Sequence, residues 1–330
     1  MNQSEIYRIF KDFNSKTILV IGDVMIDAYL VGKVHRISPE APVPIVSVTE
    51  RENRLGGAAN VALNIAALGA KAIMASVISD DDKANDFENI LSKSNLSTSG
   101  ILRSKNRVTT KKTRIISNYQ QLLRVDEEET SDLNQEDSES FINHLNNLFV
   151  EEKIDAIILQ DYNKGVITKP IIEFVVNKAK QLNIPVTADP KKKNFDAFDE
   201  VTLFKPNLKE LTEGLNIDTK PNLESLTKAF HVLVDNMNIK KALITLSEKG
   251  VFIANQNDQN IYPAHVRNIA DVSGAGDTVI AVASLCLTTN CNDETMAKLS
   301  NLAGGLVCEK VGVVPIDKER LMEEAISFEK

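Results

Sequence analysis

The sequence has little of several residue types that mark particular classes of protein. Its 330 residues include no tryptophan, three cysteines and four histidines. The cysteines (Cys286, Cys291 and Cys308) are odd in number and lack metal-site spacing, which predicts reduced thiols and excludes a disulfide-rich fold. The histidines are scattered along the chain, so the sequence indicates neither a histidine metal cluster nor a Ser-His-Asp triad.

Long hydrophobic runs are also missing. No apolar stretch reaches the roughly 20 residues that a membrane-spanning helix needs, and residues 1–5 do not begin a secretion signal. We therefore expect a cytoplasmic protein with no membrane partner. A net charge of −8 argues against a nucleic-acid partner, although it leaves room for a single nucleotide.

Two common nucleotide-binding loops do not occur in the chain. There is no Gly-x-x-x-x-Gly-Lys-Ser/Thr sequence, so the motif of the P-loop enzymes is missing. Gly22, at the end of the first predicted strand, is followed by Asp23 rather than by a Gly-x-Gly-x-x-Gly turn. A dinucleotide-dependent dehydrogenase is therefore disfavoured.

Strands and helices alternate along most of the sequence. Short apolar runs predict strands at 17–23, 71–78, 156–161, 185–190, 201–204, 242–246, 250–254 and 261–266. Helices are predicted at 1–15, 56–69, 82–93, 135–150, 168–183, 222–236, 277–289 and 293–310. This order predicts an α/β fold with a mainly parallel central sheet, in one domain spanning residues 1–330.

Two segments depart from this alternation. Residues 28–50 are β-prone but contain Pro39, Pro42 and Pro44, which excludes a central strand. Residues 107–125 read as a hairpin with its turn near Ser117. We expect the two segments to leave the main sheet and to pair as one small sheet.

The stretch from Asp271 to Asp277 combines two acids with a Gly-Ala-Gly turn before an apolar helix. The free N–H groups of a helix start bind anions, and glycine lets an anion approach the backbone. Asp277 would then place a carboxylate base beside an anion site, as phosphoryl transfer requires. An ordinary Asp cap after a Gly turn explains the same residues equally well.

Other candidate groups lie where predicted strands end, the edge at which α/β proteins bind ligands. Asn207 and Glu210 suit hydrated Mg²⁺ near phosphates, although taken alone a helix capping box is the better explanation. The stretch from Thr245 to Gly250 fits either a nucleotide phosphate or a tight hairpin. Gly57 and Asn60 fit either a sugar site or close helix packing.

These motifs, taken in order, resemble those of the ribokinase (PfkB) family of carbohydrate kinases. Residues 56–60 are similar to the N-terminal signature of the family and residues 271–277 to its C-terminal signature, and the resemblance covers roughly residues 16–320. It implies a ribokinase-like three-layer α/β/α sandwich with a small β-sheet lid from segments 28–50 and 107–125. It also implies a phosphotransferase that acts on an alcohol group and forms a homodimer through the lid.

Further segments resemble the D-glycero-D-manno-heptose 7-phosphate kinases of this family. They are residues 22–27, 36–44, 120–126, 161–165 and 189–191. The resemblance implies transfer of the ATP γ-phosphoryl group to the C1 hydroxyl of the heptose, with Mg²⁺ and with K⁺ as an activating ion. The product would feed ADP-heptose and lipopolysaccharide synthesis, and we expect a separate protein to perform the adenylyl transfer that many relatives fuse to the kinase.

The resemblance also assigns roles to individual residues. Asp277 would be the general base, and Gly274, Ala275 and Gly276 would form the anion hole. Asn207, Thr245, Ser247, Gly250 and Asn301 would bind the nucleotide, and Glu210 would hold Mg²⁺ through water. Asp27, Gly57, Asn60, Arg124, Asp161 and Lys164 would face the sugar, and Asp271 and Ser273 would bind the monovalent cation.

Two positions depart from the family pattern, and the lid carries unusual charge. Ser247 stands where the family often has glycine, and Met25 replaces the sugar-binding Asn of ribokinase, which argues against ribose. Basic residues concentrate on the predicted lid segments: Arg36, Lys111, Lys112, Arg114 and Arg124. They suit a dianionic sugar phosphate or, alternatively, a solvated strand edge protected from aggregation.

Two other functions remain open at this point. A kinase of the same family could act on another sugar, sugar phosphate or nucleoside. A catalytically silent nucleotide- or sugar-binding regulator could share the fold, although the intact Asp277 motif speaks against it.

Overall fold

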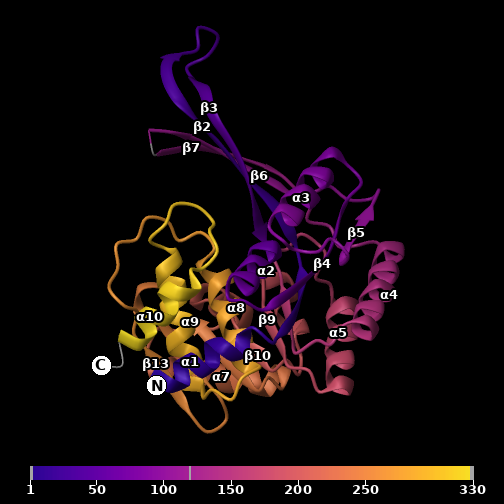
Figure 1. The fold of residues 1–330 in the computed structure, drawn as a ribbon, viewed down its shortest axis with the longest axis vertical. Helices are drawn as coiled ribbons and strands as arrows, with labels where there is room; N and C mark the ends of the chain where they lie inside the picture. The colour runs from indigo at the N-terminus through magenta and orange to yellow at the C-terminus, as the bar shows by residue number, and fades with distance from the viewer. Residues whose placement is uncertain (1–2, 119, 328–330) are drawn as a thin grey trace.

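A computed structural model describes residues 3–118 and 120–327, which form two separate sheets (Figure 1). The larger sheet has nine strands in the order β13-β12-β11-β10-β9-β8-β1-β4-β5. Its strands are β1 (Thr17–Gly22), β4 (Lys71–Ser79), β5 (Ile101–Ser104), β8 (Ala156–Gln160), β9 (Val186–Asp189), β10 (Leu203–Phe204), β11 (Lys241–Thr245), β12 (Val251–Ala254) and β13 (Gln259–Tyr262). All neighbours from β5 to β11 are parallel, and β12 and β13 add an antiparallel edge.

Helices cover both faces of this sheet. They are α1 (Gln3–Phe13), α2 (Ala58–Ala67), α3 (Asp82–Lys93), α4 (Gln135–Glu151), α5 (Lys169–Leu182), α6 (Leu208–Leu215), α7 (Leu223–Met237), α8 (Ala275–Leu287), α9 (Asp293–Val307) and α10 (Lys318–Ser327), with two 3₁₀ turns, η1 (Lys192–Ala197) and η2 (Ser247–Lys249). Side chains alternate along β1, so Ile18 and Val20 pack into one core while Leu19 and Ile21 pack into the other. The first core contains α1, α2, α8 and α9, and the second contains α4, α5 and α7, which gives three layers.

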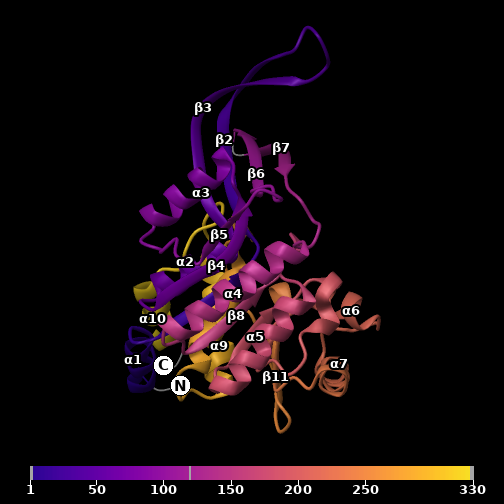
Figure 2. The ribbon, with the colours of Figure 1, turned by 90° about the vertical axis from the view of Figure 1, so that its right-hand side faces the viewer.

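The smaller sheet projects from one end of the three-layer body (Figure 2). Its order is β3-β2-β6-β7, from β2 (Val24–Ile37), β3 (Pro44–Gly57), β6 (Lys111–Ser117) and β7 (Gln120–Glu127). Because β2 pairs with β6, the prediction that the two irregular segments form one sheet is confirmed. Pro44 is the first residue of its strand, a position where proline removes no interior hydrogen bond. We call this sheet the lid.

Several predicted boundaries differ from the structure. The predicted strand 261–266 is wrong in position, since β13 ends at Tyr262 before Pro263, which lacks the N–H that a ladder requires. The predicted helix 56–69 begins only at Ala58, because Gly56 and Gly57 complete β3. The first two residues of the predicted helix 1–15 lie outside the described residues.

Within the described part of the chain, no helix is both long and apolar enough to cross a bilayer.

Candidate active site

The first turn of α8 places Asp277 at the centre of the candidate site. Gly274 precedes the helix with a φ of 82°, in the left-handed region that glycine adopts without strain. A Cβ at this position would lie 2.9 Å from Asn60 Nδ2. Glycine therefore permits both the turn and the close approach of α2, and Asp277 is only 4% exposed.

Three side chains from distant segments hold the Asp277 carboxylate. Asn60 Nδ2, on α2, donates to Oδ2 over 2.8 Å. The Tyr162 hydroxyl, directly after β8, donates to Oδ1 over 2.6 Å, and Gln160 Nε2 donates to the same oxygen over 3.3 Å. The carboxylate is therefore buried, ionisable and fixed in orientation.

Burial raises the pKa of Asp277 from 3.8 to about 6. The hydrogen bonds from Asn60 and Tyr162 oppose that rise because they stabilise the charged form. Asp189 raises the pKa further and Lys205 lowers it. A carboxylate with this pKa is mostly ionised at neutral pH and is a better proton acceptor than an exposed aspartate.

A buried cation lies beside the glycine turn. Lys205 Nζ pairs with Asp189 Oδ2 over 2.9 Å, and both side chains are at most 6% exposed. A Cβ on Gly276 would lie 3.6 Å from Lys205 Nζ, so the ammonium group faces the start of α8. Asp189 Oδ1 is buried and accepts no hydrogen bond from the described residues. A buried ammonium beside a helix N-terminus favours an anion at this position.

Sequence reasoning missed Lys205, Gln160 and Tyr162. Each stands at or just past the carboxyl end of a buried strand, β10 for Lys205 and β8 for the other two. That position is the signal that could have identified them. The main sheet places β8, β9 and β10 side by side, which brings these residues to Asp277.

Asn207 and Glu210 form the capping box that the local sequence favours. The Asn207 side chain accepts the Glu210 N–H over 2.9 Å, and Glu210 Oε2 accepts the Asn207 N–H over 2.9 Å. Glu210 Oε1 pairs with Lys191, whose ammonium lies 5.5 Å from the centre of the Tyr162 ring. Capping is thus confirmed, and the metal and nucleotide roles of the pair stay predictions.

Three of the other predicted nucleotide residues follow α7 in the chain, and Asn301 lies on α9. Thr245 bridges to Asn207 at the end of β11, and a hairpin through η2 leads to Gly250. Gly250 has a φ of 96°, and a Cβ there would lie 2.0 Å from the Tyr262 carbonyl oxygen. Ser247 also has a positive φ, and Asn301 Nδ2 donates to the Pro263 carbonyl over 2.8 Å. The predicted hairpin is therefore present, and it lies against Asn207.

The predicted sugar residues divide between the body and the base of the lid. Asp161 is buried and accepts hydrogen bonds from Asn163 N over 2.7 Å and Asn194 Nδ2 over 3.0 Å. Burial, followed by the charge of Asp23, raises the pKa of Asp161 to about 6. Gly57 has a φ of 62°, and a Cβ there would lie 2.4 Å from the Asp23 carbonyl oxygen.

Acidic partners neutralise much of the basic charge on the lid. Asp27 pairs with Arg114 and accepts the Tyr29 hydroxyl over 2.8 Å. Three other predicted cations pair with carboxylates on β7 or directly after it: Lys112 with Asp126 and Glu128, Arg124 with Asp126, and Lys164 with Glu128. Arg36 lies on the outer part of β2, opposite Ile45. An incoming dianion that meets Lys112, Arg114 or Arg124 would therefore compete with existing ion pairs.

Asp271 shapes the loop that precedes α8. Its Oδ1 accepts the Ser273 N–H and its Oδ2 accepts the Gly312 N–H, each over 2.9 Å. Burial alone would raise the pKa of Asp271, but these backbone N–H groups hold it below the usual value. No group of three or more His, Cys, Asp or Glu side chains with metal-ligand geometry occurs among residues 3–118 and 120–327.

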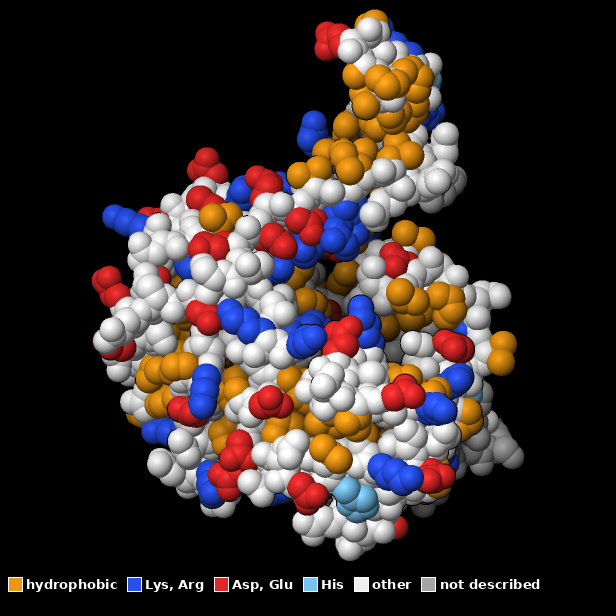
Figure 3. Space-filling view, turned by 180° about the vertical axis from the view of Figure 1, so that it is seen from behind, with side chains coloured by type: hydrophobic (Ala, Val, Ile, Leu, Met, Phe, Trp, Pro, Cys, Tyr) orange, Lys and Arg blue, Asp and Glu red, His pale blue; other side chains and the backbone are white. Residues whose placement is uncertain are grey.

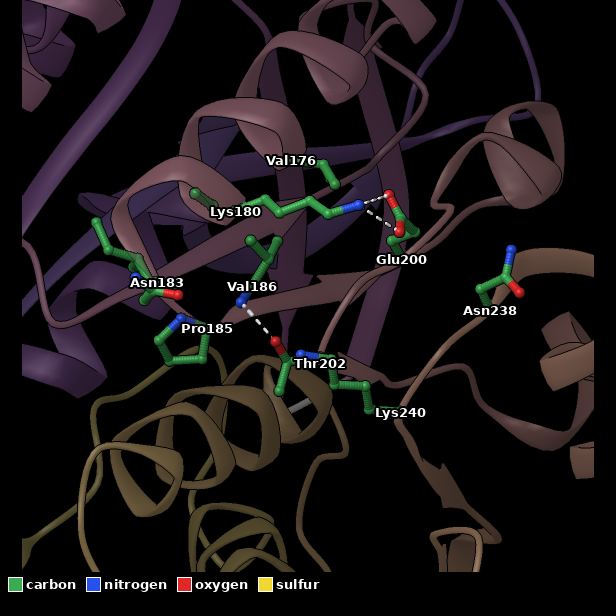
Figure 4. Close-up of a pocket in the computed structure, with 11 residues that line it drawn as sticks. Val176, Lys180, Asn183, Pro185, Val186, Glu200, Thr202, Asn238 and Lys240 are labelled. Carbon is green, nitrogen blue, oxygen red and sulfur yellow. Dashed lines mark hydrogen bonds and ion pairs between the residues drawn. The ribbon is translucent and has the colours of Figure 1, made fainter.

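One pocket lies away from this site. It has a volume of about 310 Å³, and its lining includes Val186, Thr202 and Lys240 (Figure 4). These residues stand at or before the starts of β9, β10 and β11, at the edge of the sheet opposite to Asp277. Lys180 and Glu200 already neutralise each other there.

On the face seen in Figure 3, charged side chains of both signs surround a hollow below the lid.

Comparisons with known proteins agree on one family. The profile described as "pfkB family carbohydrate kinase" matches residues 15–319. Among curated proteins, Bifunctional protein HldE of Aliarcobacter butzleri (strain RM4018) is 40% identical over 313 residues, covering 95% of this chain and 65% of that protein. HldE of Koribacter versatilis (strain Ellin345) is 39% identical over 321 residues, covering 96% and 64%. The chain thus spans about 65% of the length of these relatives.

Solved structures show the same fold at low sequence identity. Phosphofructokinase-2 from Escherichia coli in complex with potassium gives a TM-score of 0.78 at 18% identity, covering 95% of this chain and 98% of that one. Arabidopsis thaliana ribokinase complexed with ribose and ATP gives 0.70 at 16% identity, covering 93% and 98%. The architecture is therefore the ribokinase-like α/β fold that the motifs implied.

Proposed function

The chain belongs to the pfkB family of carbohydrate kinases, which phosphorylate alcohol groups, and on that premise we propose that it phosphorylates the C1 hydroxyl of D-glycero-D-manno-heptose 7-phosphate with ATP. The observation that carries this proposal is the buried Asp277 carboxylate beside a glycine turn and the Lys205 ammonium. The segments that resemble heptose 7-phosphate kinases support the choice of acceptor, and several of the curated relatives share the name Bifunctional protein HldE. The proposal treats residues 1–330 as one kinase domain with a lid.

In the proposed reaction, Asp277 takes the proton of the C1 hydroxyl. The sugar oxygen forms a bond to the γ-phosphorus, the bond from that phosphorus to the bridging oxygen breaks, and ADP leaves. The N–H groups of Gly274 and Gly276, together with Lys205, stabilise the negative charge of the transferring group. The Ala275 N–H, which donates to the Val272 carbonyl over 3.3 Å, would exchange that hydrogen bond for one to the same group. Lys205 needs no large movement, because its ammonium already faces Gly276.

The donor set around Asp189 fits a divalent cation. Asp189 has a buried oxygen without a hydrogen bond from the described residues, and Asn207 and Glu210 follow the neighbouring strand β10. These are oxygen ligands of the kind that Mg²⁺ prefers, and Glu210 would reach it through water. When bound, Mg²⁺ supplies positive charge to the ATP phosphates. Thr245, Ser247, Gly250 and Asn301 would line the rest of the nucleotide.

The monovalent cation at Asp271 and Ser273 belongs to the same proposal. A potassium complex of the structurally similar phosphofructokinase-2 supports it. Replacing KCl by NaCl at constant ionic strength tests it, since a K⁺ site predicts lower turnover in sodium. Equal turnover in both salts would remove K⁺ from the proposal.

The acceptor is tested with a panel of alcohols. The purified chain is given ATP, Mg²⁺ and one of heptose 7-phosphate, the same heptose without phosphate, fructose 1-phosphate, fructose 6-phosphate, ribose or adenosine. Phosphorus NMR identifies the phosphorylated oxygen. We expect the heptose 7-phosphate to give the highest kcat/KM and a C1 phosphate. Faster turnover of any other acceptor would assign the chain to a different kinase of the family.

The proposal also assigns contacts with the sugar and with its 7-phosphate. Asp27, Gly57, Asn60, Asp161 and Lys164 would contact the sugar. Arg124 and the neighbouring lid cations would contact its 7-phosphate by exchanging their carboxylate partners for it. The comparison of heptose with heptose 7-phosphate measures this contribution directly, because the two acceptors differ only in the phosphate.

A further inference from the structure

The loop that follows β8 is fixed by one buried carboxylate. Asp23 is 1% exposed and accepts three backbone N–H groups, from Tyr162 over 2.7 Å, Lys164 over 3.1 Å and Val166 over 2.9 Å. A segment held by three hydrogen bonds to a single side chain keeps its backbone in place. The backbone of Tyr162 is therefore held in a fixed position, from which its side chain extends.

The two oxygens of Asp277 differ in how many donors they meet. Among the described residues, Oδ1 accepts two hydrogen bonds, from Tyr162 and Gln160, whereas Oδ2 accepts one, from Asn60. A carboxylate oxygen has two lone pairs in its plane. Oδ1 is thus saturated, and Oδ2 keeps one lone pair for a further partner.

We propose that Tyr162 is a positioning residue for phosphoryl transfer, whose hydroxyl saturates Oδ1 of Asp277 and leaves Oδ2 as the oxygen that takes the acceptor proton. This inference rests on the proposed function of Asp277 as the base. In the step, the acceptor O–H bond breaks, its proton goes to Oδ2, and the freed electron pair forms the bond to phosphorus. Tyr162 keeps its own proton throughout.

The surroundings of Tyr162 favour this role as a permanent donor. Burial, followed by the charges of Asp277 and Asp189, raises the pKa of Tyr162 well above its usual value. The phenol therefore stays protonated and does not compete as a base. Lys191, above the ring, also favours the ionised form of Asp277 by its charge.

Other charged groups face Asp277 and set the background for any pH test. They are Asp189 at the end of β9, Lys205 after β10, and Lys191 before η1. None of them changes when only the Tyr162 hydroxyl is removed. A shift in the acid limb of the pH profile between wild type and a Tyr162 variant thus reports on that hydrogen bond.

The test compares wild type, Tyr162→Phe and Tyr7→Phe, assayed with ATP, Mg²⁺ and heptose 7-phosphate from pH 5 to 9. Tyr7 is 48% exposed on α1 and serves as the matched control. For Tyr162→Phe we expect the acid limb of kcat/KM to move upward by about one pH unit, because a donor to the charged carboxylate is lost. We also expect kcat on the alkaline plateau to fall about 10-fold from lost orientation, with KM for ATP within about 2-fold.

Two results overturn the inference. One is a Tyr162→Phe profile that matches wild type in both limb and plateau. The other is a plateau loss with no shift of the limb, which would show a structural effect that does not involve the carboxylate. Tyr7→Phe keeps the wild-type profile in either case.

A second measurement does not depend on the acceptor. The side-chain carbon of Asp277 is followed by NMR in ¹³C-labelled, substrate-free protein, with its signal assigned by Asp277→Asn. Replacing Tyr162 by 3-fluorotyrosine keeps its shape and strengthens the donor, so the pKa of Asp277 should fall, whereas Tyr162→Phe should raise it. Identical titrations in all three proteins contradict the inference. If heptose 7-phosphate is not a substrate, only the proposed function fails, and this titration still decides the role of Tyr162.

Discussion

Asp277 and Asp161 are two buried carboxyls, and burial raises the pKa of each to about 6. If Asp277 is the base, it must be ionised, so kcat/KM should be flat above pH 7 and fall about tenfold per unit well below pH 6. Because Asp161 titrates in the same range, its Asp161→Asn variant is the control. An acid limb that survives in Asp161→Asn belongs to Asp277, whereas loss of the limb would assign it to Asp161.

Asp277→Asn removes the proton acceptor but keeps the shape of the side chain. We expect kcat to fall by a factor of about 10² to 10⁴, the usual loss for a missing general base, while ATP affinity changes little. Turnover measures the first effect and calorimetric titration with ATP the second. The exposed Asp12→Asn variant on α1 controls for a change of one charge. Near-normal turnover of Asp277→Asn would show that another group is the base. If the chain is instead a catalytically silent regulator, the wild type itself would phosphorylate no acceptor.

At the scale of single elements, a substitution at the start of α8 should affect the stability of the fold and the activity differently. Gly276→Ala adds a methyl that meets Lys205 Nζ at an ordinary 3.6 Å. We expect the free energy of unfolding to stay the same or rise by up to about 1 kcal/mol, because alanine favours the helix. We expect kcat/KM to fall about 10-fold or more, because the methyl stands between the ammonium and the transferring group.

Denaturant unfolding and kinetics together check the Gly276 prediction. Gly305→Ala on α9 is the control for a methyl added away from the site. That methyl would lie 3.1 Å from Cδ of Arg267, so it tests a tight contact that does not involve Lys205. Activity of Gly276→Ala at the wild-type level would mean that the transferring group does not pass between Gly276 and Lys205.

The capping box of α6 allows its two proposed roles to be separated. Glu210→Gln keeps a side chain that can accept the Asn207 N–H, so we expect the free energy of unfolding to change by less than about 1 kcal/mol. If Glu210 also holds Mg²⁺ through water, the half-saturating Mg²⁺ concentration should rise 10- to 100-fold. Asn207→Ala should instead cost about 1 kcal/mol of stability through the lost cap.

A Mg²⁺ titration of turnover measures the Glu210 effect. Glu213→Gln, on the same helix and 42% exposed, controls for the lost charge. An unchanged Mg²⁺ requirement in Glu210→Gln would leave Glu210 as a capping residue alone.

At the scale of the whole molecule, the lid exposes apolar side chains that the body does not cover (Figure 3). They are Ile37, Val43, Val48, Leu122, Leu123 and Val125, each at least 38% exposed. Exposed apolar side chains gathered on a projecting sheet favour a protein partner. We propose that a second copy of the chain covers it, as the family resemblance implies.

Leu123→Glu tests that dimer. Leu123 is 55% exposed on β7, and a carboxylate in its place would be buried without a partner in the interface. We expect dimer affinity, measured by sedimentation, to fall at least about 100-fold. Val150→Glu on α4, at a site 76% exposed, should leave it unchanged. A wild-type chain that sediments as a monomer at all concentrations would contradict the lid dimer.

Most of the fold could be predicted from local patterns, and the exceptions have physical causes. Strong apolar runs identified the strands of the central sheet from β1 to β12, apart from β5, which has only four residues and depends on its pairing with β4. The helix α10 was missed because its pattern is weak and only Leu321 and Ala325 are buried. The lid was located by its prolines and its lack of helical periodicity, but its length was underestimated, since β2 and β3 each extend over 14 residues.

The sequence by itself determined the local geometry of the site. A left-handed turn at Gly274, the capping of α6 by Asn207 and the hairpin at Gly250 are short-range features, which neighbouring residues set through backbone sterics and hydrogen bonds. Only the tertiary structure decided which side chains meet Asp277. Asn60 lies 217 positions away and Tyr162 lies 115 positions away, and no local pattern specifies such contacts. Tyr162 reaches Asp277 because the sheet orders β10, β9 and β8 side by side, so that the loop after β8 lies at the first turn of α8. Asn60 reaches it because α2 packs against α8.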